Sequence, residues 1–141
     1  MVVLDTDHLS LLERADREEG GRVRARLQQV PPEDRATTIV NFEEQMRGWM
    51  AVLARARTLA KEVEAYRRLR RQLANYSGLV ILEFDERAAI EFQRLQKARL
   101  RIGTMDLKIA AIVLTQGATL LSRNRSDFSQ VPGLKAEDWT V

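Results

Sequence analysis

Five polar residues of this sequence have the types and positions expected of a metal-assisted hydrolase. Each lies just after a short apolar run or at the start of a long apolar segment: Asp5, Glu44, Asp106, Asn124 and Asp127. Carboxylate and amide oxygens suit hard cations such as Mg²⁺ or Mn²⁺. Two such ions about 3.5 to 4 Å apart can activate a water and stabilise the attacking and leaving oxygens of a phosphodiester.

Composition removes several other kinds of site. The 141 residues include no cysteine and one histidine, His8, so a zinc finger, an iron–sulfur cluster, a disulfide scaffold and a cysteine nucleophile are excluded. A Ser–His–acid triad would need His8, and no serine stands in a glycine-rich elbow. We expect His8 to be a partly exposed helix residue. Any metal site must therefore be built from oxygen ligands.

Short apolar runs alternate with helical patterns along the chain. We expect strands at 2–4, 37–40, 79–82 and 118–122, and an edge segment at 135–139. We expect helices at 7–14, 22–30, 41–56, 57–75, 87–100 and 106–116, with a charged turn at 18–21 and a turn or short helix at 124–128. This order predicts an α/β fold with a parallel sheet covered on both faces. We interpret 1–141 as a single domain with a helical hairpin at about 42–76.

The predicted sheet brings the polar residues together. In open parallel sheets, ligands lie beyond the carboxyl ends of the strands, and carboxylates converging there would repel one another without cations between them. Each residue also has an explanation that needs no metal. Asp5 and Asp7 could cap the first helix, Glu44 could close a capping box with Asn41, and Asp106 suits the first turn of its helix. Asp106, however, begins an almost wholly apolar helix and must face something polar.

The start of the chain also offers a rival interpretation. Asp5-Thr6-Asp7 is similar to the first motif of the haloacid-dehalogenase phosphohydrolases, in which an aspartate nucleophile precedes a general acid by two residues. That family continues with Gly and then Thr or Val, whereas His8-Leu9 follow here. Its later acidic pair after a Gly is also missing, which disfavours this interpretation.

Five segments in order resemble the PIN domain ribonucleases, specifically the VapC-type toxins of toxin–antitoxin pairs. The segments are Val3–Ser10, Glu44–Gly48, Asp106–Ala111, Leu120–Phe128 with Val131–Leu134, and Glu137–Trp139. The likeness covers nearly the full length and implies a PIN-like three-layer α/β/α fold with four to five short parallel strands. Glu43 and Glu44 are both acidic, and we choose Glu44 because it stands four residues before Gly48, as the family's glutamate does.

The resemblance assigns roles to the polar residues. It implies that Asp5, Glu44 and Asp106 bind the metal, and that Asn124 takes a fourth position that is often acidic in the family. Asp127, three residues later, is a possible substitute or outer ligand. An asparagine supplies one neutral oxygen, so a second metal would bind weakly or only with the help of an RNA phosphate.

The same resemblance implies a function. It suggests a Mg²⁺- or Mn²⁺-dependent endoribonuclease that cleaves structured RNA such as tRNA or rRNA with metal-activated water, forms a homodimer and is neutralised by a VapB-like antitoxin. The alternative is an inactive PIN-like binding module, disabled by Asn124, that acts only as the partner of a DNA-binding antitoxin. No apolar run approaches the roughly 18 residues of a membrane span, and the N-terminus lacks a basic signal region. We therefore expect a cytoplasmic protein.

Charge is unevenly distributed along the chain. The formal net charge is +3, but the segment 55–76 carries seven basic and two acidic residues, which leaves the remainder slightly acidic. We predict that this segment attracts RNA through Arg67, Arg68, Arg70 and Arg71, aided by Arg123 and by the second basic stretch of Arg94, Lys97, Arg99 and Arg101. The simpler explanation is a solvated helix face.

Apolar residues near the helices offer candidate contacts for a partner. Those we consider for a dimer or antitoxin interface are Leu11, Leu12, Trp49, Met50 and Leu53. Core packing is the more common position of such side chains.

Overall fold

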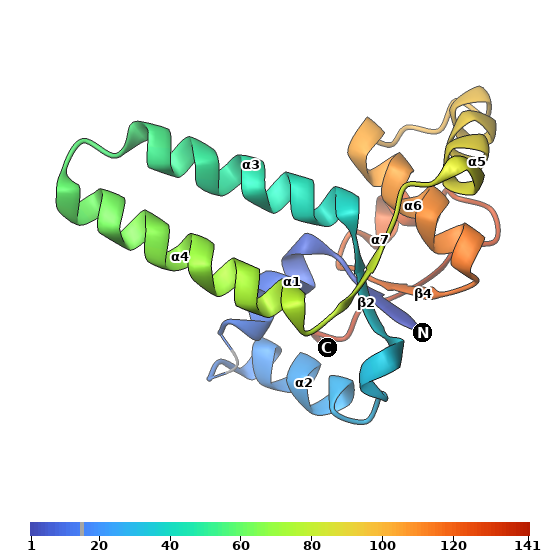
Figure 1. Cartoon of the computed structure of the whole chain (residues 1–141). Helices are drawn as coiled ribbons and strands as arrows, with labels where there is room; N and C mark the ends of the chain where they lie inside the picture. The colour runs from blue at the N-terminus through green and yellow to red at the C-terminus, as the bar shows by residue number, and fades with distance from the viewer. Residues whose placement is uncertain (15) are drawn as a thin grey trace.

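A five-stranded, all-parallel sheet forms the centre of the computed structural model, which describes residues 1–14 and 16–141. The strands are β1 (Val2–Leu4), β2 (Arg35–Thr38), β3 (Val80–Leu82), β4 (Thr119–Leu121) and β5 (Lys135–Glu137). Their order is β3-β2-β1-β4-β5, and Figure 1 labels β2 and β4. The predicted α/β class, the parallel sheet and the edge position of the last strand are confirmed.

Helices connect the strands. They are α1 (Thr6–Leu12), α2 (Glu18–Leu27), the short 3₁₀ helix η1 (Pro32–Asp34), α3 (Ile39–Arg55), α4 (Leu59–Ser77), α5 (Glu86–Lys97), α6 (Thr104–Gln116) and α7 (Arg125–Phe128). Parallel strands cannot be joined by tight turns, so each crossover carries helices over a face of the sheet.

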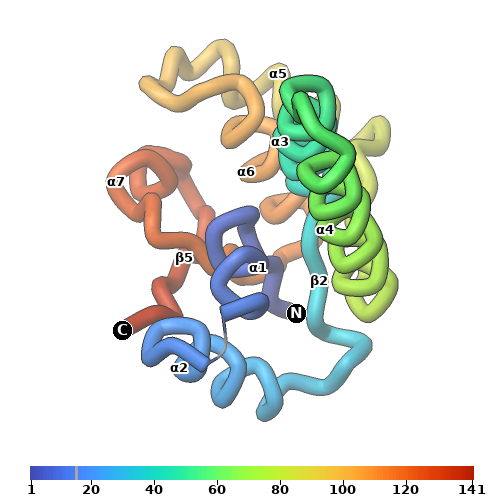
Figure 2. The backbone as a smooth tube through the Cα atoms, turned by 90° about the vertical axis from the view of Figure 1, so that its left-hand side faces the viewer, coloured from blue at the N-terminus to red at the C-terminus, as the bar shows by residue number. Residues whose placement is uncertain are grey.

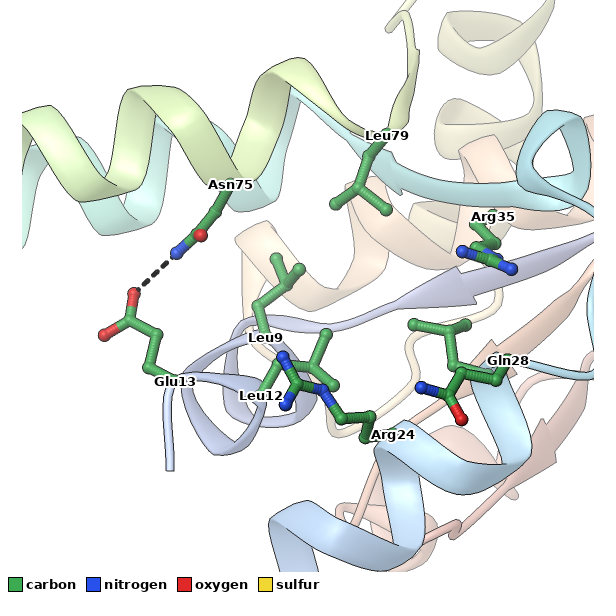
Figure 3. Close-up of a pocket in the computed structure, with 9 residues that line it drawn as sticks. Leu9, Leu12, Glu13, Arg24, Gln28, Arg35, Asn75 and Leu79 are labelled. Carbon is green, nitrogen blue, oxygen red and sulfur yellow. Dashed lines mark hydrogen bonds between the residues drawn. The ribbon is translucent and has the colours of Figure 1, made fainter. Parts of the chain in front are cut away.

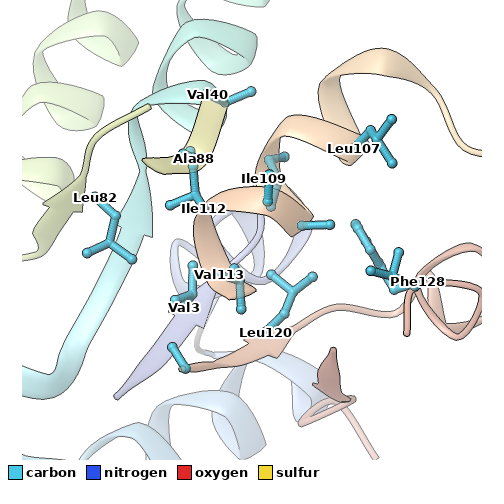
Figure 4. Packing of buried hydrophobic residues seen from close by; sticks show 14 of the residues in the cluster. Val3, Val40, Leu82, Ala88, Leu107, Ile109, Ile112, Val113, Leu120 and Phe128 are labelled. Atoms are coloured by element: carbon cyan, nitrogen blue, oxygen red, sulfur yellow. The ribbon is translucent and has the colours of Figure 1, made fainter. Parts of the chain in front are cut away.

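Successive strand residues divide between two hydrophobic clusters, because side chains along a strand point alternately to opposite faces. Val3 and Leu120 pack with α5 and α6 in one cluster (Figure 4). Leu4 and Leu121 pack in the other, with α1, α2, the end of α4 and Trp139. The predicted three-layer α/β/α arrangement is therefore confirmed.

Helix α6 lies at the centre of the larger cluster. Leu107 and the run Ile109–Val113 are buried, with 6% exposure at most. This matches the sequence pattern, in which nearly every position of the helix is apolar and no solvent-facing stripe exists. Its first turn carries Asp106, so a rigid, fully packed helix holds that carboxylate.

The end of β2 differs from the sequence prediction. The run 37–40 was expected to be a strand throughout, but Ile39 and Val40 begin α3. Thr38 is the N-cap: its Oγ1 accepts a hydrogen bond from the Asn41 N–H at 3.1 Å, and the Asn41 side chain bonds back to Thr38. This capping box outweighs the β-propensity of two branched residues.

The start of α2 was also predicted wrongly. The segment 18–21 was expected to be a turn because it contains two glycines, but it forms the first turn of α2. A Cβ atom at Gly20 would lie 2.4 Å from the carbonyl oxygens of both Leu11 and Arg14. Gly20 therefore allows α2 to approach the end of α1 more closely than any other residue would.

Helices α3 and α4 form a hairpin, which we call the arm, that extends away from the sheet (Figure 1). It spans 39–77, close to the predicted 42–76. Several large apolar side chains of the arm are exposed: Met50, Val52, Leu59, Val63, Tyr66 and Leu73. Within the described residues, no helix is long and apolar enough to cross a membrane.

A pair of Gly→Ala substitutions tests the close approach at Gly20. Gly20→Ala is expected to lower the free energy of unfolding by about 1–3 kcal/mol, because the added methyl would meet backbone atoms that cannot move aside. Gly48→Ala in α3 meets nothing within 4 Å and is expected to raise that free energy by about 0.5–1 kcal/mol. Urea denaturation of both variants measures this, and equal effects would contradict the packing.

Candidate functional site

The site lies at β1, the strand from which the chain builds the sheet first to one side, with β2 and β3, and then to the other, with β4 and β5. Strand β1 has β2 on one side and β4 on the other, and all three run parallel. The carboxyl ends of the three strands therefore meet at one edge, the position at which α/β sheets bind ligands. In Figure 2, α1, α3, α6 and α7 surround this region.

A pocket of about 360 Å³ opens at this edge, and we call it the acidic crevice. It is lined by Asp5, Thr6, Asp7, Ser10, Asn41, Glu44, Asp106, Ile109, Ser122, Asn124 and Phe128. Four of the five residues singled out in the sequence, which come from well-separated parts of the chain, thus share one pocket. The fifth, Asp127, is not part of the lining but lies beside Asn124.

Asp106 is the carboxyl of the crevice whose pKa is shifted most clearly by its surroundings. Burial raises the pKa of the Asp106 carboxyl above its ordinary value, and the negative charges of Glu44, Asp127 and Asp5 raise it further. Glu44, Asp127 and Asp5 are therefore close enough to disfavour the ionisation of Asp106. Perturbation of this kind is typical of functional sites, although structural ion networks also cause it.

Asp5 is held by the start of α1. Its Oδ1 accepts a hydrogen bond from the His8 N–H at 2.8 Å, so Asp5 is the N-cap of that helix. The His8 ring also contacts this oxygen, with Nδ1 3.2 Å away. His8 is completely buried, and the prediction of a partly exposed residue was wrong because the C-terminal segment near Trp139 covers it.

The structure distinguishes the two neighbouring glutamates of α3. Glu44 lines the acidic crevice, whereas Glu43 pairs with Arg47 on the helix surface at 2.6 Å. Glu44 takes no part in the cap of α3, so the capping explanation for it does not hold. Next to it, buried Gln45 accepts a hydrogen bond from the Tyr76 hydroxyl, which fixes α3 against α4.

Tyr76 remains neutral in this setting. Burial raises the pKa of its hydroxyl, and the charges of Glu44 and Glu13 raise it further. A neutral phenol can keep donating its proton to Gln45, whose amide lies 3.4 Å from Ser10 Oγ. Three helices are thereby joined beside Glu44.

Asn124 and Asp127 form a pair at the opposite wall. Asn124 Nδ2 donates a hydrogen bond to Asp127 Oδ2 at 2.9 Å, and the Asn124 N–H donates to Ser122 Oγ at 3.0 Å. Ser122 is fully buried and lines the crevice. Because the amide nitrogen of Asn124 bonds Asp127, the amide oxygen is the atom of this side chain that could bind a cation.

Arg123 neutralises part of the acidic rim. Its guanidinium donates to both carboxylate oxygens of Asp7, one at 3.0 Å, and to Glu19 at 3.2 Å. Hydrogen bonding to Asp7 raises the pKa of Arg123, so it stays charged. Because both oxygens of Asp7 are engaged, Asp7 is neither a free ligand nor a free general acid.

Sequence reasoning did not single out Thr6 and Ser10, which also line the crevice. Thr6 Oγ1 accepts a hydrogen bond from Asn41 Nδ2 at 3.2 Å, and Ser10 Oγ donates to the Thr6 carbonyl at 2.9 Å. Their spacing of four residues on one helix face after Asp5 is the signal that could have revealed them.

The carboxylates of the crevice are separated from one another. Across residues 1–14 and 16–141, no three His, Asp or Glu side chains lie near enough to each other to hold a metal ion as they stand. The crevice thus has the ligand types that Mg²⁺ prefers, but its carboxylates stand farther apart than metal ligands do.

The remaining candidates lie on the arm and around it. Arg67, Arg68, Arg70 and Arg71 are all exposed on α4. Arg68 bonds Glu64 at 3.2 Å and lies over the ring of Trp49, 5.2 Å from its centroid.

The apolar candidates for a partner surface differ in exposure. Leu11 is buried in the protein, whereas Met50 is 58% exposed. Leu12, Trp49 and Leu53 are half-buried. Met50 is thus the one of the five that presents most of its side chain to solvent.

A second pocket, of about 310 Å³, lies between α1, α2 and the end of α4 (Figure 3). Leucines form part of its lining, and Glu13 bonds Asn75 at its rim at 2.9 Å. Among the residues that line this pocket, Glu13 is the single acidic one. The pocket therefore does not resemble a metal site.

Comparisons with known proteins agree with the geometry. The chain is 31% identical over 67 residues to the tRNA(fMet)-specific endonuclease VapC of Salmonella typhimurium, a match covering 45% of this chain and 51% of that protein. The chain thus spans about half the length of this curated relative.

Three solved structures share the fold at below 25% identity. They are DNA-bound VapBC from Salmonella typhimurium (TM-score 0.75, 24% identity, 98% and 97% of the two chains), FitAcB from Neisseria gonorrhoeae (0.74, 22%, 99% and 98%) and VapBC-1 from nontypeable Haemophilus influenzae (0.71, 22%, all of both chains). At this identity they show the fold alone. A model of the PIN domain matches residues 2–134, which is nearly the whole chain, and the protein therefore belongs to the PIN domain family.

Proposed function

We propose that the protein is a Mg²⁺- or Mn²⁺-dependent endoribonuclease and the toxin of a toxin–antitoxin pair. The observation that carries the proposal is the acidic crevice, in which Asp5, Glu44 and Asp106 meet Asn124 at the switch point of the sheet. The raised pKa of Asp106 supports it, because burial and the charges of Glu44, Asp127 and Asp5 disfavour the ionised carboxyl, which a cation would stabilise.

The donor set of the crevice fits a hard divalent cation. Asp5, Glu44 and Asp106 would hold it, with the Asn124 amide oxygen as a neutral ligand and Asp127 behind it. The carboxylates stand apart in this structure, and they would have to move closer together to bind a cation. When bound, the metal would polarise the scissile phosphate and lower the pKa of a water.

The chain's own residues prepare the site in three ways. The α1 cap fixes Asp5, and the packed helix α6 holds Asp106. Arg123 removes one negative charge from the rim by pairing with Asp7, which reduces repulsion of an incoming phosphate.

We further propose that the substrate is structured RNA, a tRNA or rRNA, in the cytoplasm. Support comes from the relative described as a tRNA(fMet)-specific endonuclease and from the exposed arginines of the arm. Arginine grips phosphate with a planar, bidentate fork. The arm would attract the RNA backbone while the crevice meets the scissile bond.

A VapB-like antitoxin and a second copy of the chain are the proposed partners. Three of the similar solved structures are of VapBC or FitAcB assemblies. The arm offers exposed apolar area for such contacts, and four of its residues recur at helical spacing on α4: Leu59, Val63, Tyr66 and Leu73.

Paired glutamine substitutions in α3 test the catalytic proposal. Glu44→Gln is expected to lower the rate of RNA cleavage with Mg²⁺ or Mn²⁺ at least about 100-fold, because it removes a charged ligand. Glu43→Gln, one residue away, should cleave at the wild-type rate, since Glu43 pairs with Arg47 at the surface. If wild-type protein leaves RNA as intact as Glu44→Gln does, the binding-module alternative is favoured instead.

Substitution of Asp106 should separate stability from activity. The pKa of Asp106 is raised from 3.8 in the folded state. Its ionisation therefore lowers the stability of the fold as pH rises through the folded-state pKa. Below the unfolded-state pKa this loss of stability is absent. Asp106→Asn should therefore raise the Tm of metal-free protein by about 2–4 °C at neutral pH, while abolishing RNA cleavage.

Calorimetry across pH, in a chelator, measures this difference. The gap in Tm between Asp106→Asn and wild type should shrink as pH falls toward the ordinary range of the carboxyl. A gap that is independent of pH would contradict the repulsion between the acidic groups.

Charge neutralisation on the arm tests RNA binding. In a Glu44→Gln background, which keeps the RNA intact, changing Arg67, Arg70 and Arg71 to Gln should weaken binding. The plot of log affinity against log salt should become shallower by about 2 units. Arg68 is left in place because it bonds Glu64 and covers Trp49.

The matched control changes three exposed cations elsewhere: Arg24, Arg87 and Lys135. Fluorescence anisotropy with a labelled tRNA at several salt concentrations measures both triple variants. Equal slopes for the two would show that the arm is only a solvated helix face.

A further inference from the structure

We propose that His8 is a positioning residue that sets the orientation of the Asp5 carboxylate for metal binding, an inference that rests on the proposed function. His8 touches no substrate or metal position itself. It is completely buried in the first turn of α1, between Asp5 and the C-terminal segment. Through the His8 ring, the C-terminal segment around Trp139, which we call the tail, would fix the orientation of Asp5 in the acidic crevice.

Both ring nitrogens of His8 are engaged. Nε2 accepts a hydrogen bond from the Trp139 N–H at 3.2 Å, so it carries a lone pair. Nδ1 lies 3.2 Å from Asp5 Oδ1 and must carry the ring proton, because a neutral imidazole has one donor and one acceptor nitrogen. Asp5 Oδ1 thus accepts two hydrogen bonds from His8, one from the backbone and one from the ring.

The two oxygens of the Asp5 carboxylate have different surroundings. Its Oδ1 is occupied by His8, while Asp5 lines the crevice and its side chain is 15% exposed. Oδ2 has no hydrogen-bond partner in the described part of the chain, and is the oxygen available to a cation. Outer hydrogen bonds of this kind orient metal ligands and are worth about 10- to 100-fold in metal affinity or activity.

The tail that holds His8 is itself firmly attached. The Thr140 carbonyl accepts from Arg22 Nε at 2.6 Å, and the Glu137 carbonyl accepts from the Ser122 N–H at 2.9 Å. Arg26 lies over the Trp139 ring, 4.5 Å from its centroid. The Trp139 N–H is therefore a fixed donor, and it holds the plane of the His8 ring.

A packing role alone does not account for these contacts. An apolar side chain could fill the same space, but it would leave the buried Trp139 N–H without an acceptor and Asp5 Oδ1 without its second donor. The two nitrogens also have different partners: Nε2 bonds the Trp139 N–H, and Nδ1 bonds Asp5 in the crevice. This difference allows the two roles to be separated by substitution.

Two amide substitutions each keep one of the two contacts. In His8→Asn the amide nitrogen can take the place of Nδ1 and keep donating to Asp5, but nothing reaches Trp139. In His8→Gln the amide oxygen can take the place of Nε2 and accept from Trp139, but the donor to Asp5 is lost. His8→Gln should therefore be the more stable of the two variants, and His8→Asn should bind the metal more tightly.

Mn²⁺ titration and thermal denaturation of the full-length protein measure the two properties. His8→Gln is expected to bind Mn²⁺ about 10-fold more weakly than wild type while keeping a Tm near that of wild type. His8→Asn should keep the wild-type affinity with a lowered Tm. Affinity that follows Tm in both variants, or that is unchanged in both, would overturn the positioning role.

A measurement on wild-type protein avoids any loss of folding in the variants. Because His8 is the only histidine in the sequence, ¹⁵N NMR of the labelled imidazole reports it alone. The proposal expects the ring proton on Nδ1 and a lone pair on Nε2, and a shift of the Nδ1 resonance on addition of Mg²⁺. An Nε2–H tautomer, or an Nδ1 resonance that Mg²⁺ leaves unmoved while it binds, would overturn the role of His8 alone. Absence of any Mg²⁺ or Mn²⁺ binding would overturn the proposed function as well.

Discussion

Repulsion between carboxylates at the carboxyl edge of β1 is the constraint around which the rest of the structure is arranged. A parallel sheet with its first strand in the middle brings the ends of β1, β2 and β4 together, and with them Asp5, Glu44 and Asp106. Two neighbouring segments reduce part of this repulsion. In α1, the N–H and the ring of His8 bond Asp5, and after β4, Arg123 pairs with Asp7. Asp106 is also half-buried, and burial together with the charges of Glu44, Asp127 and Asp5 raises its pKa.

Much of this could be predicted from the sequence, because the relevant signals are local. Continuous apolar runs indicate buried parallel strands, and the residue after each run must lie at the carboxyl edge. That reasoning alone places Asp5 and Asn124 at the same edge of the sheet, although they lie near opposite ends of the chain. Asp106 was found by a different local signal, since a charge that begins an apolar helix needs a polar surrounding.

Other features depend on contacts that a single sequence does not reveal. His8 looked like an ordinary helix residue because the tail that buries it comes from the far end of the chain. The partnership of Asp7 and Arg123 likewise joins residues distant in sequence. At 37–40 the β-branched pattern competed with a capping box, and one hydrogen-bonded pair, Thr38 with Asn41, moved the boundary by two residues.

The arm differs from the rest of the chain in how it is held. In the described part of the protein, neither hydrophobic cluster includes any residue from 43 to 75, and the arm contributes Val40, Phe42 and Tyr76 to them. Side chains on its outer half can consequently be exchanged without disturbing the sheet or the crevice. Selection could thus remodel the arm quickly for a new partner or target, while the chemistry at the base of the molecule is inherited unchanged.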